Sequence, residues 1–360
     1  MRVLPNNDEL DFDHDSLKNN SYPKIINKYN PFRIKKNIKK YSITSIIIII
    51  LEITFIFVTF FLSLQRAIKT IMKRKDVKNY IVKKNDVKDL KVCLCTPVKL
   101  ENKYIKDFVQ FYQKIGVDKI FLYDNNDKDG EKIEDIIPEY IKNGFVEISD
   151  WRGKQKQLMN MMDDCYQRNY KIYDWLIFYE VDEYIHLKNY TNIKNFLINE
   201  KFDTCPKIYL NWVFHTDNDQ YHYEKKPVQE RFPQKETIAD KKGRHNFVKT
   251  IIRGHLPNLK IDCVHRLVRD VPGCNGNGKE VQLRLFRMQE QDFENYYIDH
   301  YLYKSLEEFL EKLINDSDMD LKNETIYKLF KNQNITFEKI NYIENITRMN
   351  LTSLKHYINY

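Results

Sequence analysis

Short apolar runs alternate with amphipathic segments between residues 91 and 179 of this chain. The runs have the length of buried strands, and in the segments between them apolar residues recur at helical spacing. Strands that alternate with helices in this way predict βαβ units and a parallel sheet. The predicted elements are strands at 91–97, 119–123, 145–149 and 175–179 and helices at 105–115, 133–141 and 154–169.

Beyond residue 200 the pattern is less regular, and long polar stretches separate the apolar runs. Long loops in a compact domain are often binding loops or lids. The predicted elements there are strands at 207–214, 247–252 and 282–286, polar loops at 216–245 and 265–280, a helix at 304–315 and an Asn-rich helical tail over 320–360.

The fourth predicted strand, Trp175–Tyr179, runs directly into three acids, Glu180, Asp182 and Glu183. A strand that is apolar on both faces is typical of the centre of a parallel sheet, and open α/β sheets bind ligands at the carboxyl ends of such strands. If the strand continues, Glu180 and Asp182 point the same way. Two carboxylates on one side suit Mg²⁺ or Mn²⁺, which in turn binds phosphate oxygens. The alternative, a strand that runs into a solvated acidic turn, stays open on these residues alone.

One segment, residues 42–64, is apolar over a length that spans a bilayer as a helix, for which about 20 residues suffice. It lies far from Met1 and no small-residue cleavage site follows it, so it is not a usual signal peptide. Lys and Arg are plentiful on both sides, and the positive-inside rule therefore does not decide its orientation.

N-glycosylation sequons beyond this segment bear on the orientation, because they fit a lumenal carboxyl-terminal domain. They begin at Asn189, Asn323, Asn334, Asn345 and Asn350. We therefore predict a single-pass, type II membrane protein of the Golgi or the endoplasmic reticulum.

The charge of the chain changes this picture little. Its formal net charge is +8, with 59 basic residues against 51 acidic ones, and the excess is concentrated around the apolar segment. A basic stripe on a folded domain would suggest nucleic acid, whereas basic flanks of an apolar helix suggest membrane anchoring. We predict no nucleic-acid partner and keep a basic nucleic-acid binder as the weakest alternative.

Six cysteines are compatible with two interpretations. Cys93 and Cys95 are too close for a usual zinc knuckle, and no CxxC pair occurs in the sequence. An even number of cysteines fits disulfides in an oxidising lumen. Buried free thiols fit equally well, so the sequence leaves the choice open.

A series of short motifs follows in a definite order along the chain. Neither a GxGxxG motif nor a P-loop comes after the first strand, so this is not a usual dinucleotide-binding protein or P-loop ATPase. The motifs are Leu94-Cys95-Thr96-Pro97, Phe121-Leu122-Tyr123-Asp124, the stretch from Tyr140 to Trp151, Asp164-Cys165, Glu180-Val181-Asp182-Glu183-Tyr184, Asp299-His300-Tyr301 and the stretch from Lys304 to Phe309. Over about residues 90–312 their order and spacing resemble glycosyltransferase family 92 and its family-2-like relatives.

The resemblance implies a GT-A fold, which is a Rossmann-like mixed α/β sheet flanked by helices, here preceded by a single transmembrane helix. It also implies a UDP-linked nucleotide-sugar donor, a divalent metal (Mn²⁺ or Mg²⁺), and transfer of galactose to a glycan acceptor with inversion. The acidic motif of the family usually begins with Asp. This chain has the longer Glu180 there, which puts the geometry of ligation in doubt.

The chemistry gives the acidic motif and one histidine their expected roles. Displacement of a nucleoside diphosphate gathers negative charge on the leaving group, so a cation bound there is the largest aid. Asp182 is the expected metal ligand, and Glu180 contacts the metal or the ribose of the donor. Glu183 orients either one or is a solvated acid. His300 resembles a late histidine of the family and is a metal ligand or phosphate contact, unless it is structural.

Further candidates come from other segments. Asp124 ends the second strand and is expected to hold the nucleotide or to close an Asx-turn. Lys249 and Arg253 are cations that could meet the diphosphate, although Arg253 is more typical of a solvated strand edge. An inverting enzyme also needs a base for the acceptor hydroxyl, and Asp217 and Asp219 are candidates by position alone.

Two classes of function stay open. The first is a membrane-anchored, metal-dependent glycosyltransferase. The second is a non-catalytic protein on the same fold that binds a glycan or a nucleotide sugar, which the departure at Glu180 and the absence of an obvious base favour. Trp151 and Trp212 could stack on a sugar or a base, or pack in the core. The predicted division of the chain is a cytoplasmic tail 1–41, a transmembrane helix 42–64, a stem 65–88, a catalytic domain 89–315 and a helical tail 316–360.

Overall fold

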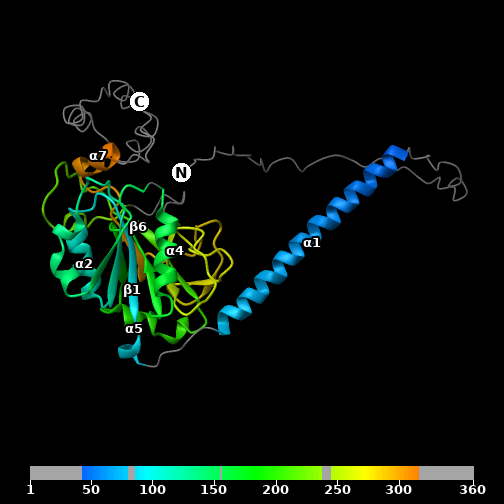
Figure 1. The fold of residues 1–360 in the computed structure, drawn as a ribbon, viewed down its shortest axis with the longest axis horizontal. Coiled ribbons are helices and arrows are strands. Elements are labelled where there is room, and N and C mark those ends of the chain that lie inside the picture. The colour runs from blue at the N-terminus through cyan, green and yellow to red at the C-terminus, as the bar shows by residue number, and fades with distance from the viewer. Residues whose placement is uncertain (1–42, 80–85, 155, 237–244, 316–360) are drawn as a thin grey trace, which may run out of the picture. The chain divides into compact units, whose positions relative to one another are not determined.

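The chain divides into two units, Met1–Ser63 and Leu64–Tyr360. The described part of the first unit belongs to helix α1 (Ile43–Asn79), and the second unit holds a mixed sheet with its helices (Figure 1). The computed structural model describes residues 43–79, 86–154, 156–236 and 245–315. The predicted tails at 1–41 and 316–360 lie outside these residues.

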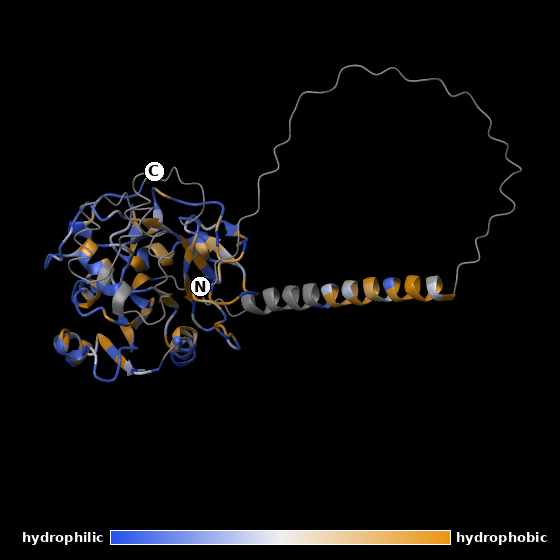
Figure 2. Cartoon of the chain, turned by 90° about the horizontal axis from the view of Figure 1, so that it is seen from above, coloured by the Kyte–Doolittle hydropathy of each residue, from blue (hydrophilic) through white to orange (hydrophobic). Residues whose placement is uncertain are grey.

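Helix α1 carries the segment that the sequence predicts to span a membrane. Residues Ile46–Gln65 are long and apolar enough to cross a bilayer. Large apolar side chains are exposed along this stretch, and Figure 2 shows the hydrophobic colour along it. Length and composition are therefore compatible with the single-pass anchor predicted at 42–64. The helix continues to Asn79, through part of the predicted stem.

The strands of the second unit form a mixed sheet, in which parallel and antiparallel pairs meet at β4. The strands are β1 (Val92–Val98), β2 (Lys119–Asp124), β3 (Val146–Asp150), β4 (Trp175–Phe178), β5 (Glu183–Leu187), β6 (Lys207–Phe214), β7 (Val248–Arg253), β8 (Gly273–Asn275), β9 (Glu280–Val281) and β10 (Tyr296–His300). They lie in the order β3-β2-β1-β4-β7-β6-β10-β5, while β8 pairs with β6 and β9. β1, β2, β3 and β4 pair in parallel, as the alternating pattern predicts. β7 runs antiparallel to both β4 and β6, and β10 pairs in parallel with β6 and antiparallel with β5.

Helices cover both faces of the parallel half, with α2 and α4 on opposite sides of β1 (Figure 1). Along β1, Val92 and Leu94 belong to the core that includes α2. Cys93 and Cys95 belong to the core that includes α4. Because successive side chains of a strand point to opposite faces, the largely apolar run of β1 follows from burial on both sides.

The helices are α2 (Ile105–Lys114), α3 (Pro138–Lys142), α4 (Leu158–Asn169), α5 (Ile193–Leu197), α6 (Val228–Arg231) and α7 (Leu306–Asn315), with short 3₁₀ turns at Val87–Asp89, Ile133–Asp135 and Glu200–Phe202. The predicted fold class, an α/β sheet flanked by helices, is confirmed.

Some predicted elements differ in the structure. The helix predicted at 133–141 is divided, because Pro138 lacks the N–H to continue it and instead begins α3. The strand predicted at 282–286 is wrong: Arg284 and Arg287 exchange backbone hydrogen bonds of 3.1 Å and close a tight turn. The apolar pattern does not reveal β5 and β10, because polar and charged residues interrupt both strands.

Two disulfides resolve the choice that the sequence leaves open. Cys95–Cys165 joins β1 to α4, and Cys205–Cys274 joins the segment before β6 to β8. Cys93 is a buried free thiol and Cys263 a half-buried one. This pairing is consistent with folding in an oxidising compartment.

Removal of the Cys95–Cys165 disulfide is expected to lower the free energy of unfolding by about 2–4 kcal/mol, because it joins residues 70 positions apart. Urea denaturation of the double variant Cys95→Ala/Cys165→Ala measures the change. Cys263→Ser removes a free thiol and is the matched control, expected within about 0.5 kcal/mol of wild type. Equal stabilities of the double variant and the wild type would contradict the bond.

Candidate functional site

The predicted acidic motif lies in a tight turn at the carboxyl end of β4. The strand ends at Phe178, and the N–H of Glu183 donates to the carbonyl of Glu180 at 3.0 Å, which closes the turn. Glu183 then begins β5. The strand does not continue through the motif as the sequence reasoning assumes. The turn, and not strand alternation, sets where Glu180 and Asp182 point.

Asp182 and His300 meet at this turn. The Nε2 of His300 lies 3.6 Å from Oδ1 of Asp182, and the two residues are only 5% and 3% exposed. The N–H of Tyr301 donates to the carbonyl of Asp182 at 2.9 Å, which fastens β10 to the turn. Asp182 Oδ1 and His300 Nδ1 lack a hydrogen-bond partner among the described residues. Buried polar atoms are nearly always paired, so these atoms indicate a place for a ligand.

Two lysines from other elements neutralise the acids. Thr250 of β7 pairs with Phe178, the last residue of β4, so the preceding residue Lys249 lies beside the acidic turn. Lys249 is fully buried, contacts the Glu180 carboxylate and lies 3.4 Å from Glu183 Oε1. Lys312 of α7 lies 3.3 Å from Asp182 Oδ2. Such partners are needed because burial strips ions of their hydration.

These contacts divide the three acids by their pKa values. Burial raises the pKa of Asp182, but Lys312 and His300 outweigh burial and hold it well below its usual range. Burial likewise opposes ionisation of Glu180, and Lys249 overcomes it and lowers the pKa. For Glu183 burial prevails: it raises the pKa to about 8 against the attraction of Lys249. At neutral pH, Asp182 and Glu180 are ionised while Glu183 is largely protonated.

Glu183 is part of the buried framework of the turn. It is fully buried, and its Oε2 accepts a hydrogen bond of 3.0 Å from the N–H of Glu180. The alternative of a solvated acid is therefore wrong. Glu180 differs, because its side chain is 41% exposed and remains accessible to a ligand.

The donor set of Asp182 and His300 fits a divalent cation of the manganese type. A carboxylate oxygen and an imidazole nitrogen are both ligands that Mn²⁺ accepts, and such ions commonly keep waters and phosphate oxygens among their ligands. Glu180 is held by Lys249 and would have to leave it to join them. In the described parts of the chain, no three His, Cys, Asp or Glu side chains are grouped as a metal site.

Lys312 also lines a cavity of about 130 Å³ next to the carboxyl end of β1. Lys304 reaches into the same region, with its Nζ 3.8 Å from the centre of the Tyr104 ring and 3.8 Å from Glu101 Oε2. The cavity is smaller than the roughly 300–1,000 Å³ of usual small-molecule sites, so it suits a part of a larger ligand. The charged residues that line it are Lys99, Lys103, Lys304, Lys312, Glu101, Glu131, Glu308 and Glu311.

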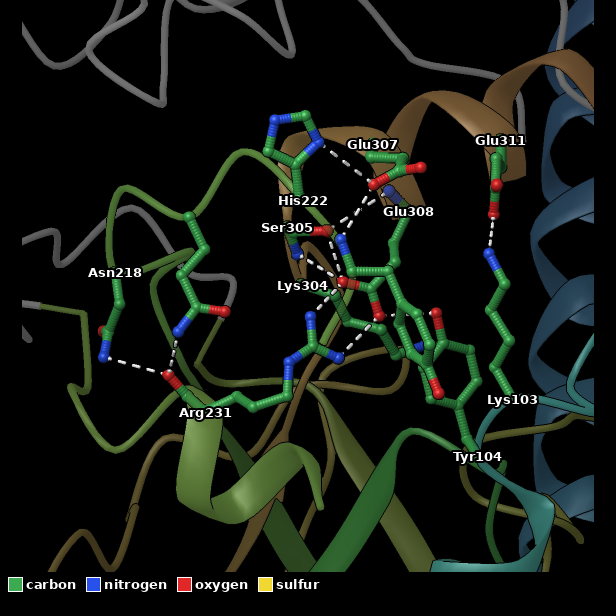
Figure 3. Close-up of polar contacts among 12 residues, drawn as sticks. Lys103, Tyr104, Asn218, His222, Arg231, Lys304, Ser305, Glu307, Glu308 and Glu311 are labelled. Carbon is green, nitrogen blue, oxygen red and sulfur yellow. Dashed lines mark hydrogen bonds and ion pairs between the residues drawn. The ribbon is translucent and has the colours of Figure 1, made fainter. Parts of the chain in front are cut away.

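A buried ion pair holds the helix that carries Lys312. Arg231 donates from Nη1 to Glu308 Oε1 at 2.9 Å, and both side chains are 1% exposed (Figure 3). Tyr104 donates to the same Oε1 at 2.7 Å. The N–H of Ser305 donates to Glu308 Oε2 at 3.0 Å, and the N–H of Glu308 donates to the Ser305 hydroxyl at 3.4 Å. This is a capping box that starts α7.

Two predicted phosphate or nucleotide contacts have partners within the fold. Asp124 accepts from the N–H of Asn126 at 3.0 Å and from Arg152 Nε at 2.6 Å. The Asx-turn alternative is therefore present, and a nucleotide contact stays a prediction. Arg253 is buried and donates to the carbonyls of Cys205 and Phe202. It is neither a solvated strand-edge cation nor placed to bind diphosphate.

The candidate bases lie in the loop after β6. The N–H of Asp219 donates to Asp217 Oδ1 at 3.1 Å. Phe214, the last residue of β6, pairs with His300, so this loop leaves the sheet at the same edge as the acidic turn. The base role stays a prediction from position.

Of the two candidate stacking tryptophans, one lies at the site. Trp151 packs near Tyr123, with ring centres 6.1 Å apart, and Trp212 lies 4.5 Å from His300. Lys312 and His265, which approach the same region, are missed by the sequence reasoning. Only the pairing of β10 with β6 and the docking of α7 reveal them.

Comparison with known proteins gives a consistent result over most of the chain. A family model described as "Glycosyltransferase family 92" matches residues 88–339. A glycosyltransferase family 92 protein of Ricinus communis is 28% identical over 110 residues, which is 30% of this chain and 19% of that protein. One of Oryza sativa subsp. japonica is 25% identical over 118 residues, 32% of this chain and 19% of that protein. The aligned segments therefore span about a fifth of these relatives.

Solved structures show only a distant similarity. Residues 1–349 of S. aureus TarS, in complex with UDP-GlcNAc, are 12% identical and cover 69% of this chain and 77% of that one, with a TM-score of 0.35. Mannosyltransferase PcManGT from Pyrobaculum calidifontis, in complex with GDP-Man and Mn²⁺, is 6% identical and covers 40% of this chain and 42% of that one, with a TM-score of 0.28. Similarities at these scores carry no argument about this chain.

Glu308→Ala is expected to lower the free energy of unfolding by about 3–5 kcal/mol, because it leaves Arg231 buried without a counter-ion. Chemical denaturation measures the loss. Glu311→Ala is the matched control on the same helix, since the Lys103–Glu311 pair is 34% and 47% exposed and should contribute less than about 1 kcal/mol. A loss for Glu308→Ala as small as that of the control would contradict the role of the pair.

Proposed function

Because this chain belongs to glycosyltransferase family 92, we propose that it transfers a sugar from a UDP-linked donor to a glycan acceptor with the help of Mn²⁺ or Mg²⁺. Family membership supports the transferase class. Galactose as the sugar and inversion at its anomeric carbon are part of the proposal. The observation that carries it is the meeting of Asp182 and His300 at the carboxyl end of β4, beside a lysine-lined cavity.

The proposed roles of the site residues follow from their contacts. Asp182 and His300 would hold the metal, and Glu180 would contact the metal or the ribose of the donor. The metal would neutralise charge that develops on the leaving diphosphate. Glu183 fixes the turn through its hydrogen bond to the Glu180 amide, and Lys249 contacts the Glu180 carboxylate and lies 3.4 Å from Glu183.

The lysine-lined cavity is the proposed place for the diphosphate. Lys304 and Lys312 bring positive charge to it, and each already lies near an acid that a bound phosphate would compete with. Asp124, at the carboxyl end of a neighbouring parallel strand, is our proposed contact for the nucleotide. Asp217 and Asp219 are the proposed bases, because their loop begins beside His300 and could reach an acceptor hydroxyl.

The proposed setting is the lumen of the Golgi or the endoplasmic reticulum. A type II arrangement places residues 1–41 in the cytoplasm, 42–64 in the membrane, and the stem 65–88 in the lumen. The catalytic domain 89–315 and the tail 316–360 follow on the lumenal side. Two disulfides support an oxidising compartment. No nucleic acid is expected among the partners.

Asp182→Ala is expected to reduce nucleotide release by at least about 10²-fold, because it removes a carboxylate that stabilises charge in the transition state. A screen of UDP- and GDP-sugars with Mn²⁺ on purified residues 85–360 identifies the donor, and nucleotide release then measures the loss. EDTA should have the same effect on wild type. Asp150→Asn is the matched control, an exposed acid at the carboxyl end of β3, and should retain activity.

Full activity of Asp182→Ala, or of wild type in EDTA, would contradict this assignment. Nucleotide-sugar binding without turnover against a broad acceptor panel would favour the non-catalytic binding protein instead. Circular dichroism of each variant separates loss of chemistry from loss of fold.

Asn189 is expected to carry an N-linked glycan when the full chain is expressed in eukaryotic cells. It lies exposed in the turn after β5 and begins an Asn-Tyr-Thr sequon, and only a lumenal domain meets the glycosylation machinery. Gel mobility before and after glycosidase treatment should show that Asn189→Gln loses one glycan. Asn143→Gln, at an exposed Asn outside any sequon, is the control. A wild-type chain without any glycosidase-sensitive shift would contradict the lumenal orientation.

A further inference from the structure

A group of contacting rings extends from His300 to Phe286. Trp212 lies 4.5 Å from His300 and 5.3 Å from His265, measured between ring centres. His265 lies 4.9 Å from Phe286. Phe247 contacts the other three members, at 5.5 Å from Trp212, 5.7 Å from His265 and 5.0 Å from Phe286. Trp212, Phe247, His265 and Phe286 together are called the aromatic wall below.

The wall is assembled from separate parts of the chain beside the site. Trp212 is on β6, directly next to β10, and Phe247 immediately precedes β7. Phe247 forms a β-bridge with Arg287, which brings the turn containing Phe286 against it. Trp212, Phe247 and Phe286 are each only half-buried. Ring surface therefore remains open, in contrast to a core aromatic such as Trp175, which is fully buried.

The hydrogen-bonding state of His265 is fixed by its surroundings. Its Nδ1 lies 3.1 Å from the carbonyl oxygen of Val248, and because a carbonyl only accepts, Nδ1 carries the proton. Burial, reinforced by the ammonium of Lys249, lowers the pKa of His265 to about 4. At neutral pH its Nε2 is therefore an unprotonated hydrogen-bond acceptor.

Polar atoms of the wall are left without partners. His265 is 5% exposed, and its Nε2 is buried with no hydrogen bond to any described residue. The Nε1 of Trp212, which can only donate, is likewise buried and has no hydrogen-bond partner among the described residues. A buried acceptor and a buried donor on adjoining rings are costly to leave unmet. A ligand that offers both a donor and an acceptor would satisfy them.

We propose that the aromatic wall is the subsite for the acceptor sugar, where a pyranose ring packs its C–H face on the rings and hydrogen-bonds to Trp212 Nε1 and His265 Nε2. A sugar has the required mixture of an apolar ring face and polar hydroxyls, and aromatic pockets with a few placed polar groups bind such ligands. This inference rests on the proposed function, since it takes the Asp182–His300 pair as the donor end of the site.

The geometry favours the acceptor over the transferred sugar of the donor. The transferred sugar must stay at the diphosphate, near Asp182 and His300. Phe286 contacts His265 and Phe247, which in turn contact Trp212, the member of the wall that lies against His300. The wall therefore extends past the place of reaction, as a surface for the second substrate does.

Phe286→Ala tests the wall, with Leu285→Ala as the matched control. Leu285 is the neighbouring residue in the same turn, is 67% exposed and has no ring to stack. The protein is first applied to a broad glycan array, and the saccharide bound most strongly is then titrated against each variant in the presence of UDP and Mn²⁺. Phe286→Ala should raise the Kd for this saccharide roughly five- to tenfold. The Kd of Leu285→Ala should stay within about twofold of that of wild type. The KM for the acceptor should rise by the same factor as the Kd.

A second pair of variants keeps the test independent of folding. Phe286→Leu retains apolar volume but removes the aromatic face. His265→Phe retains a ring but removes Nε2, together with the Nδ1 contact to the Val248 carbonyl. Both variants should bind the same saccharide more weakly than wild type, and their melting temperatures report whether they fold.

The outcomes separate this inference from the proposed function. Saccharide binding that none of these wall variants changes, or no array binding by a protein that releases nucleotide from its donor, overturns the subsite and leaves the transferase assignment standing. A wild-type protein that binds no nucleotide sugar and releases no nucleotide instead overturns the proposed function, whatever the wall variants show.

Discussion

The structure around the site depends on one electrostatic constraint: the two ionised carboxylates of the acidic turn, Glu180 and Asp182, need counter-charges. Water cannot hydrate Asp182, because it is almost completely buried, and a buried ion without a partner is strongly destabilising. The counter-charges come from β7 through Lys249 and from α7 through Lys312, while His300 of β10 lies 3.6 Å from Asp182. Each lies far from the acids in the sequence. The turn can therefore be buried only when the antiparallel half of the sheet and the last helix are in place.

This constraint explains why the last described helix is so firmly fixed. Lys312 can reach Asp182 only if α7 begins at the correct point. The start of the helix is set by the Ser305–Glu308 capping box, and Glu308 is in turn paired with Arg231 of α6 and Tyr104 before α2. A single carboxylate thus joins three segments around the cavity. Dissolved salt screens exposed ion pairs such as Lys103–Glu311 and weakens them. The Arg231–Glu308 pair is buried and is therefore screened much less.

The parallel half of the fold, and the place of the site, follow from sequence because their signals are local. A mostly apolar run such as Val92–Val98 can be recognised without knowledge of the strands that pair with it. The acids Glu180, Asp182 and Glu183 are also visible in the sequence, directly after the apolar run that forms β4. The antiparallel half is different. β5 and β10 carry Glu183, His186, Asp299 and His300 within their short lengths, so they lack an apolar pattern and exist because they pair with each other. Lys312 and His265 could not be identified for the same reason: their importance comes from contacts across the fold, which no spacing in the chain encodes.

The site has two sides with different chemistry, and His300 stands between them. On one side lie Asp182 and the cavity next to β1, whose lining is charged and includes Lys304 and Lys312. On the other lies the aromatic wall, which offers ring faces and two nitrogens without a hydrogen-bond partner among the described residues. The parallel pairing of β10 with β6 creates this division, because it sets His300 beside Phe214 and brings its ring to 4.5 Å from that of Trp212. In the proposed transfer, the bond from the anomeric carbon of the sugar to the diphosphate breaks and a bond from that carbon to the acceptor hydroxyl forms, so both environments are needed around one carbon atom. In this fold they meet at the end of two adjacent strands, so the sheet itself keeps them in register.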